Sequence, residues 1–159
     1  MNNLLILDID ETLLHSTYED LKREPNFYFK ERGVYLRPYL NKFLENCFKK
    51  YDVAIWTSAK ADYAKFILKK ITCDLSKFKF IWTRNNCQRI TKWNGFMNVE
   101  SYIKDLTKIQ GYELENIKII DDTPQNIIPT ENVLFIEEYR GNKEDDNLIQ
   151  ILHLLNEIN

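Results

Sequence analysis

The sequence has few residues of the kinds that cross-link small secreted domains or bind zinc. It contains three cysteines with no Cys-x-x-Cys pair, and its two histidines, His15 and His153, lie far apart. An odd number of cysteines without metal-ligand spacing argues against a disulfide framework and against a zinc site. We therefore expect Cys47, Cys73 and Cys87 to be free thiols in a reducing compartment.

Long apolar runs and a large net charge are also missing. No segment approaches the roughly 20 consecutive apolar residues that span a bilayer. The N-terminal run Leu4–Leu7 ends at Asp8 and has no basic residue before it, which is unlike a secretory signal. The net charge of −2 gives no global reason to expect nucleic acid or an anionic membrane as a partner. We expect an intracellular protein, cytoplasmic or nuclear, with no membrane association.

The remaining composition is that of a globular chain with one core. Hydrophobic residues make up 44% of the 159 positions, which is enough to bury a substantial core. Four glycines and four prolines give no sign of a flexible interdomain linker. We interpret residues 1–159 as a single domain.

Short apolar runs alternate with segments of helical spacing along this domain. Strands alternating with helices predict an α/β fold, with a parallel sheet and helices on both faces. Five strands are predicted over residues 4–7, 51–56, 78–82, 117–120 and 133–136, and helices over residues 40–48, 61–71, 99–109 and 148–155.

One segment breaks the alternation. Phe27–Phe29 and Val34–Leu36 are two short apolar runs around a Lys-Glu-Arg-Gly sequence, which predicts an antiparallel hairpin that covers the carboxyl end of the first strand. Only about 25 residues remain for an insertion there, and about 15 before the helix predicted over residues 99–109, whereas a cap domain needs 50 or more. We expect a short hairpin flap and no large cap domain.

Acidic and hydroxyl residues follow three of the predicted strands at the point where each ends. Ligands of open α/β sheets bind outside these carboxyl ends. Four carboxylates at one edge would repel each other unless a cation lay among them. Mg²⁺ fits, because it takes few carboxylates and keeps positions for water and phosphate. The residues are Asp8 and Asp10 after the first strand, Thr57 and Ser58 after the second, and Asp121 and Asp122 after the fourth.

A magnesium site beside several acids favours phosphoryl transfer, where catalysis is mostly positioning and charge neutralisation. One carboxylate can attack phosphorus and form an aspartyl-phosphate. A second, two residues further on, can protonate the leaving oxygen and later deprotonate water. Crowding of two acids favours a proton on one of them. Lys104, on the helix predicted over residues 99–109, and Thr57 are candidates for holding the phosphate oxygens.

These segments resemble a known family. The string Asp8 to Leu13 is similar to the first motif of the haloacid dehalogenase (HAD) superfamily of aspartate-nucleophile phosphatases. Further strings resemble the FCP/SCP-like phosphatases that act on the C-terminal domain (CTD) of RNA polymerase II, and they occur in order along nearly the whole chain. The resemblance implies a HAD-like Rossmannoid three-layer sandwich. The strings are Leu14-His15, Leu36-Arg37-Pro38, Trp56–Ala59, Tyr102–Leu106 and Ile120–Pro124.

The resemblance also implies roles for single residues. Asp8 corresponds to the nucleophile and Asp10 to the general acid/base, while Thr57 and Lys104 hold the phosphoryl group.

The Mg²⁺ ligands implied by the resemblance are the Asp8 carboxylate, the Asp10 backbone carbonyl and the pair Asp121 and Asp122, with Asp122 binding directly.

We also expect Thr12, Ser58 and Arg84 to bind substrate. Arg84 stands where the family often has an arginine followed two or three residues later by cysteine. Two segments depart from the family pattern: residues 14–37 are compact, and residues 88–99 are longer than in the small members. Both lie where substrate side chains would be recognised.

A site without a lid is more open to a large substrate than to a small metabolite. We therefore expect a Mg²⁺-dependent protein serine/threonine phosphatase whose partner is a phosphorylated protein or peptide. Two alternatives remain: a phosphatase for another exposed phosphate, such as a polynucleotide end or a nucleotide, and a non-catalytic relative that uses the fold for binding. Presence of Asp8, Asp10 and Lys104 favours catalysis over the last of these.

Overall fold

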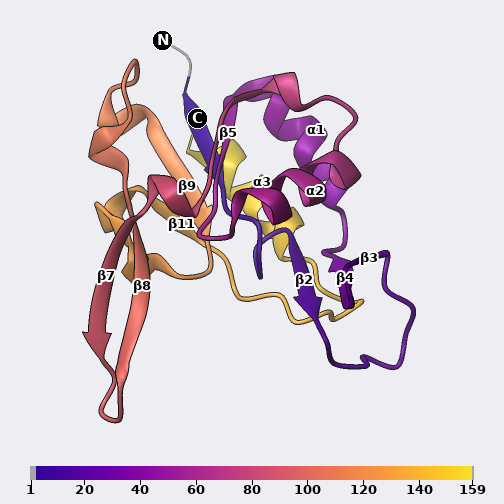
Figure 1. Cartoon of the computed structure of the whole chain (residues 1–159). Helices are drawn as coiled ribbons and strands as arrows, with labels where there is room; N and C mark the ends of the chain where they lie inside the picture. Colours follow the sequence, from indigo (N-terminus) through magenta and orange to yellow (C-terminus); the bar gives the residue numbers. More distant parts are fainter. Residues whose placement is uncertain (1–2, 159) are drawn as a thin grey trace.

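Five parallel strands form the central sheet of the computed structural model, which describes residues 3–158 (Figure 1). Their spatial order is β11-β9-β1-β5-β6, and all five predicted strands are confirmed. Because the chain leaves β1 toward β5 on one side and reaches β9 on the other, the order reverses at β1, where such sheets bind ligands. The strands are β1 (Leu4–Leu7), β5 (Asp52–Trp56), β6 (Phe78–Trp82), β9 (Ile117–Asp121) and β11 (Val133–Phe135).

The central strand β1 is buried on both faces of the sheet. Leu5 and Leu7 belong to the core on one face, and Leu4 and Ile6 to the core on the other, each at most 1% exposed. This division follows the two-residue period of a strand. It explains why β1 is a continuous apolar run rather than an alternating one.

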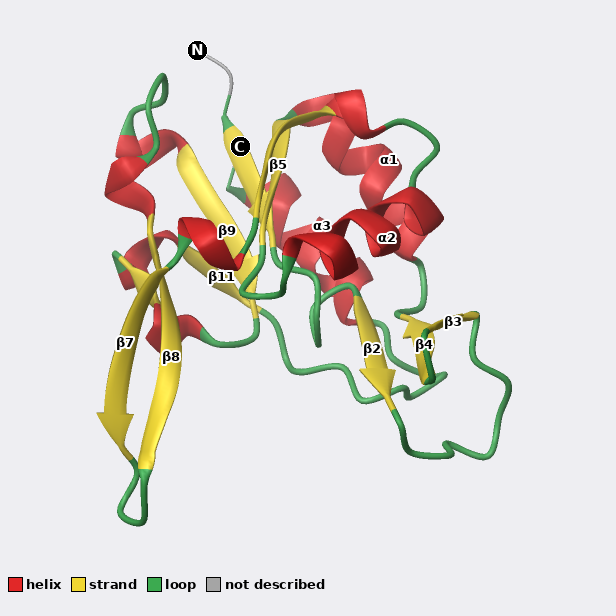
Figure 2. Cartoon of the chain, in the orientation of Figure 1, coloured by secondary structure: helices red, strands yellow, loops and turns green. Residues whose placement is uncertain are grey.

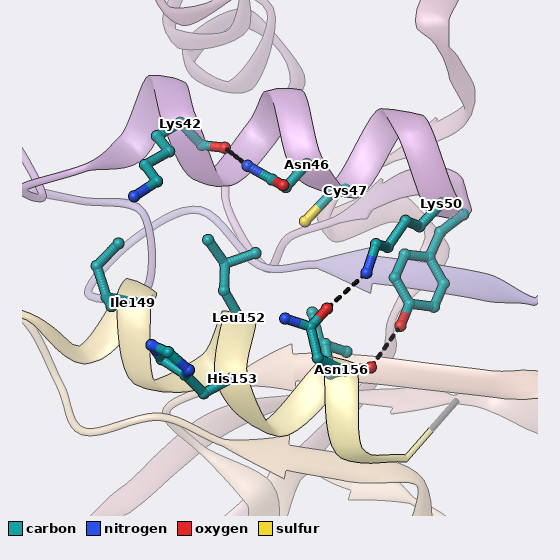
Figure 3. Close-up of a pocket in the computed structure, with 10 residues that line it drawn as sticks. Lys42, Asn46, Cys47, Lys50, Ile149, Leu152, His153 and Asn156 are labelled. Atoms are coloured by element: carbon teal, nitrogen blue, oxygen red, sulfur yellow. Dashed lines mark hydrogen bonds between the residues drawn. The ribbon is translucent and has the colours of Figure 1, made fainter.

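In the described part of the chain, three α-helices cover one face of the sheet (Figure 2). They are α1 (Leu40–Lys50), α2 (Ala61–Ile71) and α3 (Asn147–Glu157), and they confirm three of the four predicted helices. Helices α1 and α3 lie side by side and enclose a small pocket of about 170 Å³, and at one end of it Lys50 Nζ donates a 2.5 Å hydrogen bond to Asn156 Oδ1 (Figure 3). The pocket shares no lining residue with the carboxyl edge of the sheet.

The other face packs against Leu106, Ile109 and Ile127, which lie in 3₁₀, loop and strand segments. Within residues 3–158 no α-helix packs on this face, so the expectation of helices on both faces is wrong, as is the helix predicted over residues 99–109. That segment forms β8 (Asn98–Asp105), which pairs with β7 (Gln88–Trp93) in an antiparallel hairpin and with β10 (Ile127–Ile128) in parallel. The apolar spacing of a short segment fits a helix or a half-buried strand, and pairing with a neighbouring strand decides between them. Gly95, with φ of 99°, makes the turn that allows the pairing.

The predicted hairpin flap is confirmed, with one strand more than expected. Strands β3 (Phe27–Phe29) and β4 (Arg32–Leu36) pair antiparallel, and β2 (Leu14–Thr17) adds to the other side of β4. Phe29 packs against α2, with its ring centroid 5.0 Å from that of Tyr63. Contact with α2 holds this three-stranded flap beside the carboxyl end of β1.

Within residues 3–158, six 3₁₀ turns connect these elements. They are η1 (Leu75–Lys77), η2 (Arg84–Asn86), η3 (Leu106–Lys108), η4 (Leu114–Asn116), η5 (Pro124–Asn126) and η6 (Thr130–Asn132). Within the described part of the chain, no helix has the length and apolar character needed to cross a bilayer.

Candidate active site

Three carboxylates meet at the carboxyl edge of the central sheet. Asp8 follows β1, Asp121 ends β9 and Asp122 comes next, and one oxygen of each lies within 4.8 Å of the others. The register pairs Leu7 with Ile120, so the residues that follow them leave the sheet side by side. Asp8 is 6% exposed and Asp121 is fully buried. The predicted gathering of acids is thus present for these three residues.

Lys104 enters this cluster from β8 and bridges two of its members. Its Nζ lies 2.7 Å from Asp8 Oδ1 and 2.6 Å from Asp121 Oδ2, and the residue is 3% exposed. Burial lowers the pKa of Lys104, but the two carboxylates outweigh it and hold that pKa above its ordinary value. The side chain is therefore an ammonium ion at neutral pH. Lys104 was expected at this edge of the sheet on a helix, and the structure has it there on a strand.

The charges of this cluster do not balance within the described residues. Three carboxylates and one ammonium leave an excess of two negative charges if all are ionised. Burial raises the pKa of Asp8, against the lowering effect of Lys104, and burial also raises the pKa of Asp122. A hard divalent cation with oxygen ligands would offset the excess, and the donor set fits Mg²⁺.

The two neighbouring aspartates differ in how many partners they already have. Asp121 uses Oδ2 for Lys104, and its Oδ1 accepts hydrogen bonds from the Thr123 amide at 2.8 Å and hydroxyl at 2.7 Å. Asp122 accepts one side-chain hydrogen bond, at Oδ1 from the Thr12 hydroxyl at 3.1 Å. Asp122 is therefore more available than Asp121 to bind a cation, through its second carboxylate oxygen.

Asp10 turns its carboxyl group toward α2 and stays outside the three-carboxylate cluster. Its Oδ1 accepts a hydrogen bond of 2.5 Å from the Tyr63 hydroxyl. Burial raises the pKa of Asp10, while the Tyr63 hydrogen bond and the charge of Arg32 oppose the rise. A carboxyl group with a raised pKa, two residues from Asp8, is suited to carry a proton. Tyr63 gave no sign of this contact in the sequence.

The loop that carries Asp8 and Asp10 is a tight turn held from below by a buried arginine. Leu13 N donates to Ile9 O at 2.8 Å, and Glu11 adopts a positive φ of 61°. Arg37 Nη1 donates to Thr12 O at 3.1 Å, and Arg37 also binds Asp145 with Nε at 2.7 Å and Nη2 at 2.9 Å. These hydrogen bonds hold the loop in position at the carboxyl edge of the sheet.

The remaining predicted residues lie around these groups. Thr57 is 1% exposed and follows β5, and its hydroxyl accepts a hydrogen bond from Ala59 N at 3.1 Å. Arg84 Nε donates to Ser58 O at 2.8 Å, which joins η2 to the loop before α2. Ser58, Arg84 and Asp10 line one pocket. Thr12 does not line that pocket, and its hydroxyl donates to Asp122 Oδ1 instead.

A parallel sheet whose carboxyl edge gathers acids around one buried lysine, with small sheets in place of a cap, defines a HAD-like α/β protein. The chain belongs to the NLI interacting factor-like phosphatase family, whose model matches residues 3–159.

Known proteins resemble the chain over nearly its whole length. It is 29% identical over 160 residues to CTD small phosphatase-like protein 2 of Dictyostelium discoideum, covering 95% of this chain and 26% of the relative. It is 27% identical over 177 residues to a CTD phosphatase-like protein of Invertebrate iridescent virus 6, covering 96% of each. The chain spans half or less of the length of the first two relatives.

A solved structure shares the fold. The fission yeast RNA polymerase II CTD phosphatase Fcp1, bound to beryllium fluoride, aligns with a TM-score of 0.66 and 16% identity, over 98% of this chain and 50% of that one. The likeness confirms the HAD-like architecture with a five-stranded parallel sheet and no large cap.

Proposed function

We propose that this protein is a Mg²⁺-dependent phosphatase that hydrolyses phosphate monoesters through an aspartyl-phosphate on Asp8. The observation that carries the proposal is the cluster of buried Asp8 and Asp121 with half-buried Asp122, in which Lys104 bridges the first two. Such a cluster offers a nucleophile, a phosphate-binding cation and oxygen ligands for a metal at one point.

Asp8 acts first, as its free carboxylate oxygen attacks phosphorus and the ester oxygen leaves. Asp10 gives its proton to that oxygen, which needs a carboxyl group that is protonated at the start. Asp10 then takes a proton from water, and the resulting hydroxide attacks the phosphorus of the aspartyl-phosphate. Inorganic phosphate departs, Asp8 is regenerated as a carboxylate and Asp10 again holds a proton. Lys104 and Thr57 hold phosphoryl oxygens during both steps.

Asp8, the Asp10 backbone carbonyl and Asp122 would hold the Mg²⁺ ion. When bound, the ion supplies positive charge against the phosphoryl oxygens. Asp121 was predicted as a ligand beside Asp122. Since both of its oxygens already accept hydrogen bonds, we assign it to positioning Lys104 and the loop that carries Asp122.

The substrate we propose is a phosphorylated serine or threonine in a protein or peptide. Two findings support this choice. Several relatives are named as CTD phosphatase-like proteins. The site is flanked by two small sheets, β2-β4-β3 and β10-β8-β7, neither of which is large enough to close over a small metabolite.

Hydrolysis of a chromogenic aryl phosphate tests the chemistry directly. We expect activity that requires Mg²⁺ and stops with a chelator. Asp8→Asn should abolish it, because the amide is a poor nucleophile, with a loss of at least about 10⁴-fold in kcat. The matched control is Asp74→Asn, an exposed aspartate between α2 and β6 that makes the same charge change away from the carboxylate cluster and from the pocket that Asp10 lines. Activity that survives in Asp8→Asn would remove Asp8 from its role.

A further inference from the structure

A pocket of about 370 Å³ opens beside Asp10. Its walls come from five separate parts of the chain: the loop after β1, the segment after β2, the β3–β4 turn, the start of α2 with the loop before it, and η2. Since Asp10 is part of the wall, a group that fills this pocket would lie next to the ester oxygen that Asp10 protonates under the proposed function.

The pocket is positively charged although the whole chain has a net charge of −2. Four lysines and arginines line it, against the two acids Asp10 and Asp62. Within residues 3–158 none of the four cations lies in salt-bridge distance of a carboxylate, whereas ion pairs form elsewhere on the molecule. An anionic ligand would therefore meet unpaired positive charge here. The cations are Lys30, Arg32, Lys60 and Arg84.

Arg32 contacts more aromatic rings than the other three cations. Its guanidinium carbon lies 4.9 Å from the ring centroid of Tyr63, 5.7 Å from that of Phe29 and 5.9 Å from that of Tyr18. Rings that hold a guanidinium in this way keep its N–H groups free for another partner. A planar guanidinium is well matched to the two oxygens of a carboxylate or phosphate.

The N-terminus of α2 adds to the positive potential of the pocket. Its N-cap is Lys60, whose side chain makes no capping hydrogen bond, at a position where Ser, Thr, Asp or Asn is usual. The first-turn N–H groups of this 11-residue helix are thus not capped by the N-cap side chain, and the helix dipole favours an anion there. Asp62 in the first turn is exposed to solvent and offsets this only in part.

We infer that this pocket is a subsite for a second anionic group of the substrate, a carboxylate or phosphate on a residue next to the phosphorylated serine or threonine. This inference rests on the proposed function and narrows its substrate class to acidic or multiply phosphorylated peptides. A polynucleotide end fits less well, because bases bind by stacking on open aromatic faces. Of the three rings that line this pocket, those of Phe29 and Tyr63 already contact Arg32 and each other, which leaves the ring of Tyr18 as the exposed one.

Phosphopeptides of matched sequence test the subsite. Each peptide carries a phosphoserine to be hydrolysed. One neighbouring position, between two residues before it and two residues after it, is varied among alanine, proline, glutamate and a second phosphoserine. We expect the glutamate and bis-phosphorylated peptides to exceed the alanine peptide at least about tenfold in kcat/KM at one position, with the preference weakening as salt is raised. The glutamate and phosphoserine series distinguish the two sources of the anion.

Two variants connect the preference to the pocket. Arg32→Gln and Lys60→Gln should each lower the ratio of kcat/KM between the anionic and alanine peptides toward one. Lys60 is exposed, so its replacement leaves the core untouched even if Arg32→Gln disturbs the flap. Lys69→Gln, at the far end of α2 and outside the pocket, has the same charge change and should leave the ratio unaltered.

Several results would overturn the inference. These are a ratio near one in the wild type, an anionic preference that persists in both pocket variants, or a higher kcat/KM for a phosphorylated DNA end than for every peptide. The aryl phosphate assay distinguishes failure of the subsite inference from failure of the proposed function. If hydrolysis depends on Asp8 but shows no preference for anionic peptides, only the subsite is excluded.

Discussion

At the scale of single residues, the two aspartates of the first motif are separated by what their carboxyl groups touch. Asp8 faces Lys104 and the neighbouring carboxylates, while Asp10 faces Tyr63. Burial raises the pKa of both, but only Asp8 has an ammonium group in contact to favour its anion. Their contacts thus distinguish two residues of identical chemistry, since Asp8 is paired with an ammonium group and Asp10 with a hydroxyl group.

Asp10→Asn tests that division of roles. We expect kcat for aryl phosphate to fall about 100-fold or more, since general acid/base catalysis typically contributes that much. The Mg²⁺ concentration for half-maximal activity should stay within about twofold of the wild type, because the proposed ligand from residue 10 is its backbone carbonyl. Mg²⁺ titrations of kcat measure both quantities.

Tyr63→Phe is the companion variant. It keeps the ring that packs on Phe29 and removes the hydroxyl that binds Asp10. A smaller loss of kcat than in Asp10→Asn, about tenfold, is expected from the lost orientation of one hydrogen bond. A large loss of Mg²⁺ affinity in either variant would contradict the assignment.

At the scale of elements, the sequence revealed what depends on local pattern. The buried strand β1 and the helices α1 to α3 carry their apolar residues at the spacing of their structure. Asp8, Thr57 and Asp121 could be predicted as site residues because they lie at the carboxyl ends of such strands. The contacts of Arg37 with Asp145 and of Tyr63 with Asp10 join positions 108 and 53 residues apart, and no local spacing encodes them.

The wrongly predicted helix over residues 99–109 also shows that local spacing is not sufficient to predict structure. Lys104 was placed on a helix because Val99, Tyr102 and Ile103 recur at helical spacing. The strand β8 forms instead because β7 and β10 pair with both of its edges. Since those partners lie before and after it in the chain, the periodicity of the segment alone could not decide its structure.

Asp145→Asn tests how far the buried Arg37 anchor stabilises the fold. Arg37 is 1% exposed and donates to Asp145 through two nitrogens. Removing one partner of a buried pair leaves the other charge uncompensated, so the free energy of unfolding should fall by about 3 kcal/mol at pH 7. Urea denaturation measures it, and Glu45→Gln, on the exposed side of α1, is the control that should change it by less than about 0.5 kcal/mol.

The pH dependence of that difference has a definite sign. Burial raises the pKa of Asp145. The hydrogen bonds from Arg37 and Asn147, together with the positive charge of Arg37, outweigh burial and lower that pKa in the folded state. The stabilisation is therefore present above the unfolded pKa of about 3.9 and is lost as pH falls through the lower folded value. The gap between wild type and Asp145→Asn should stay constant from about pH 6 to 8 and narrow below about pH 4. A gap that widens on acidification would refute this account.

At the scale of the whole molecule, two small sheets flank the carboxyl edge of the central sheet on opposite sides (Figure 1). The β2-β4-β3 flap contributes the pocket beside Asp10, and the β7–β8 hairpin delivers Lys104 to the carboxylates. Both insertions thus reach the site through one end, and their other ends project from the body. In each insertion, the end at the active site is therefore the part needed for the chemistry, and substitutions at the projecting end should affect the chemistry least.

The two ends of β8 give the last prediction. At the tip of the hairpin Phe96 is 88% exposed, whereas Ile103, next to Lys104, is 7% exposed within the fold. Phe96→Ser should change the free energy of unfolding by less than about 0.5 kcal/mol and leave aryl phosphate turnover unaltered, because it removes no buried contact. Ile103→Ala should cost about 2 to 4 kcal/mol through lost burial and a residual cavity.

Thermal and urea denaturation of the two variants, with kcat measured below their transitions, makes the comparison. Ile103→Ala should also lower kcat, because a cavity beneath β8 loosens the strand that positions the Lys104 ammonium between Asp8 and Asp121. Equal destabilisation by the two substitutions would mean that the hairpin tip packs on the body in solution. In that case the tip would contribute to holding the lysine, and the separation of its two ends proposed here would be wrong.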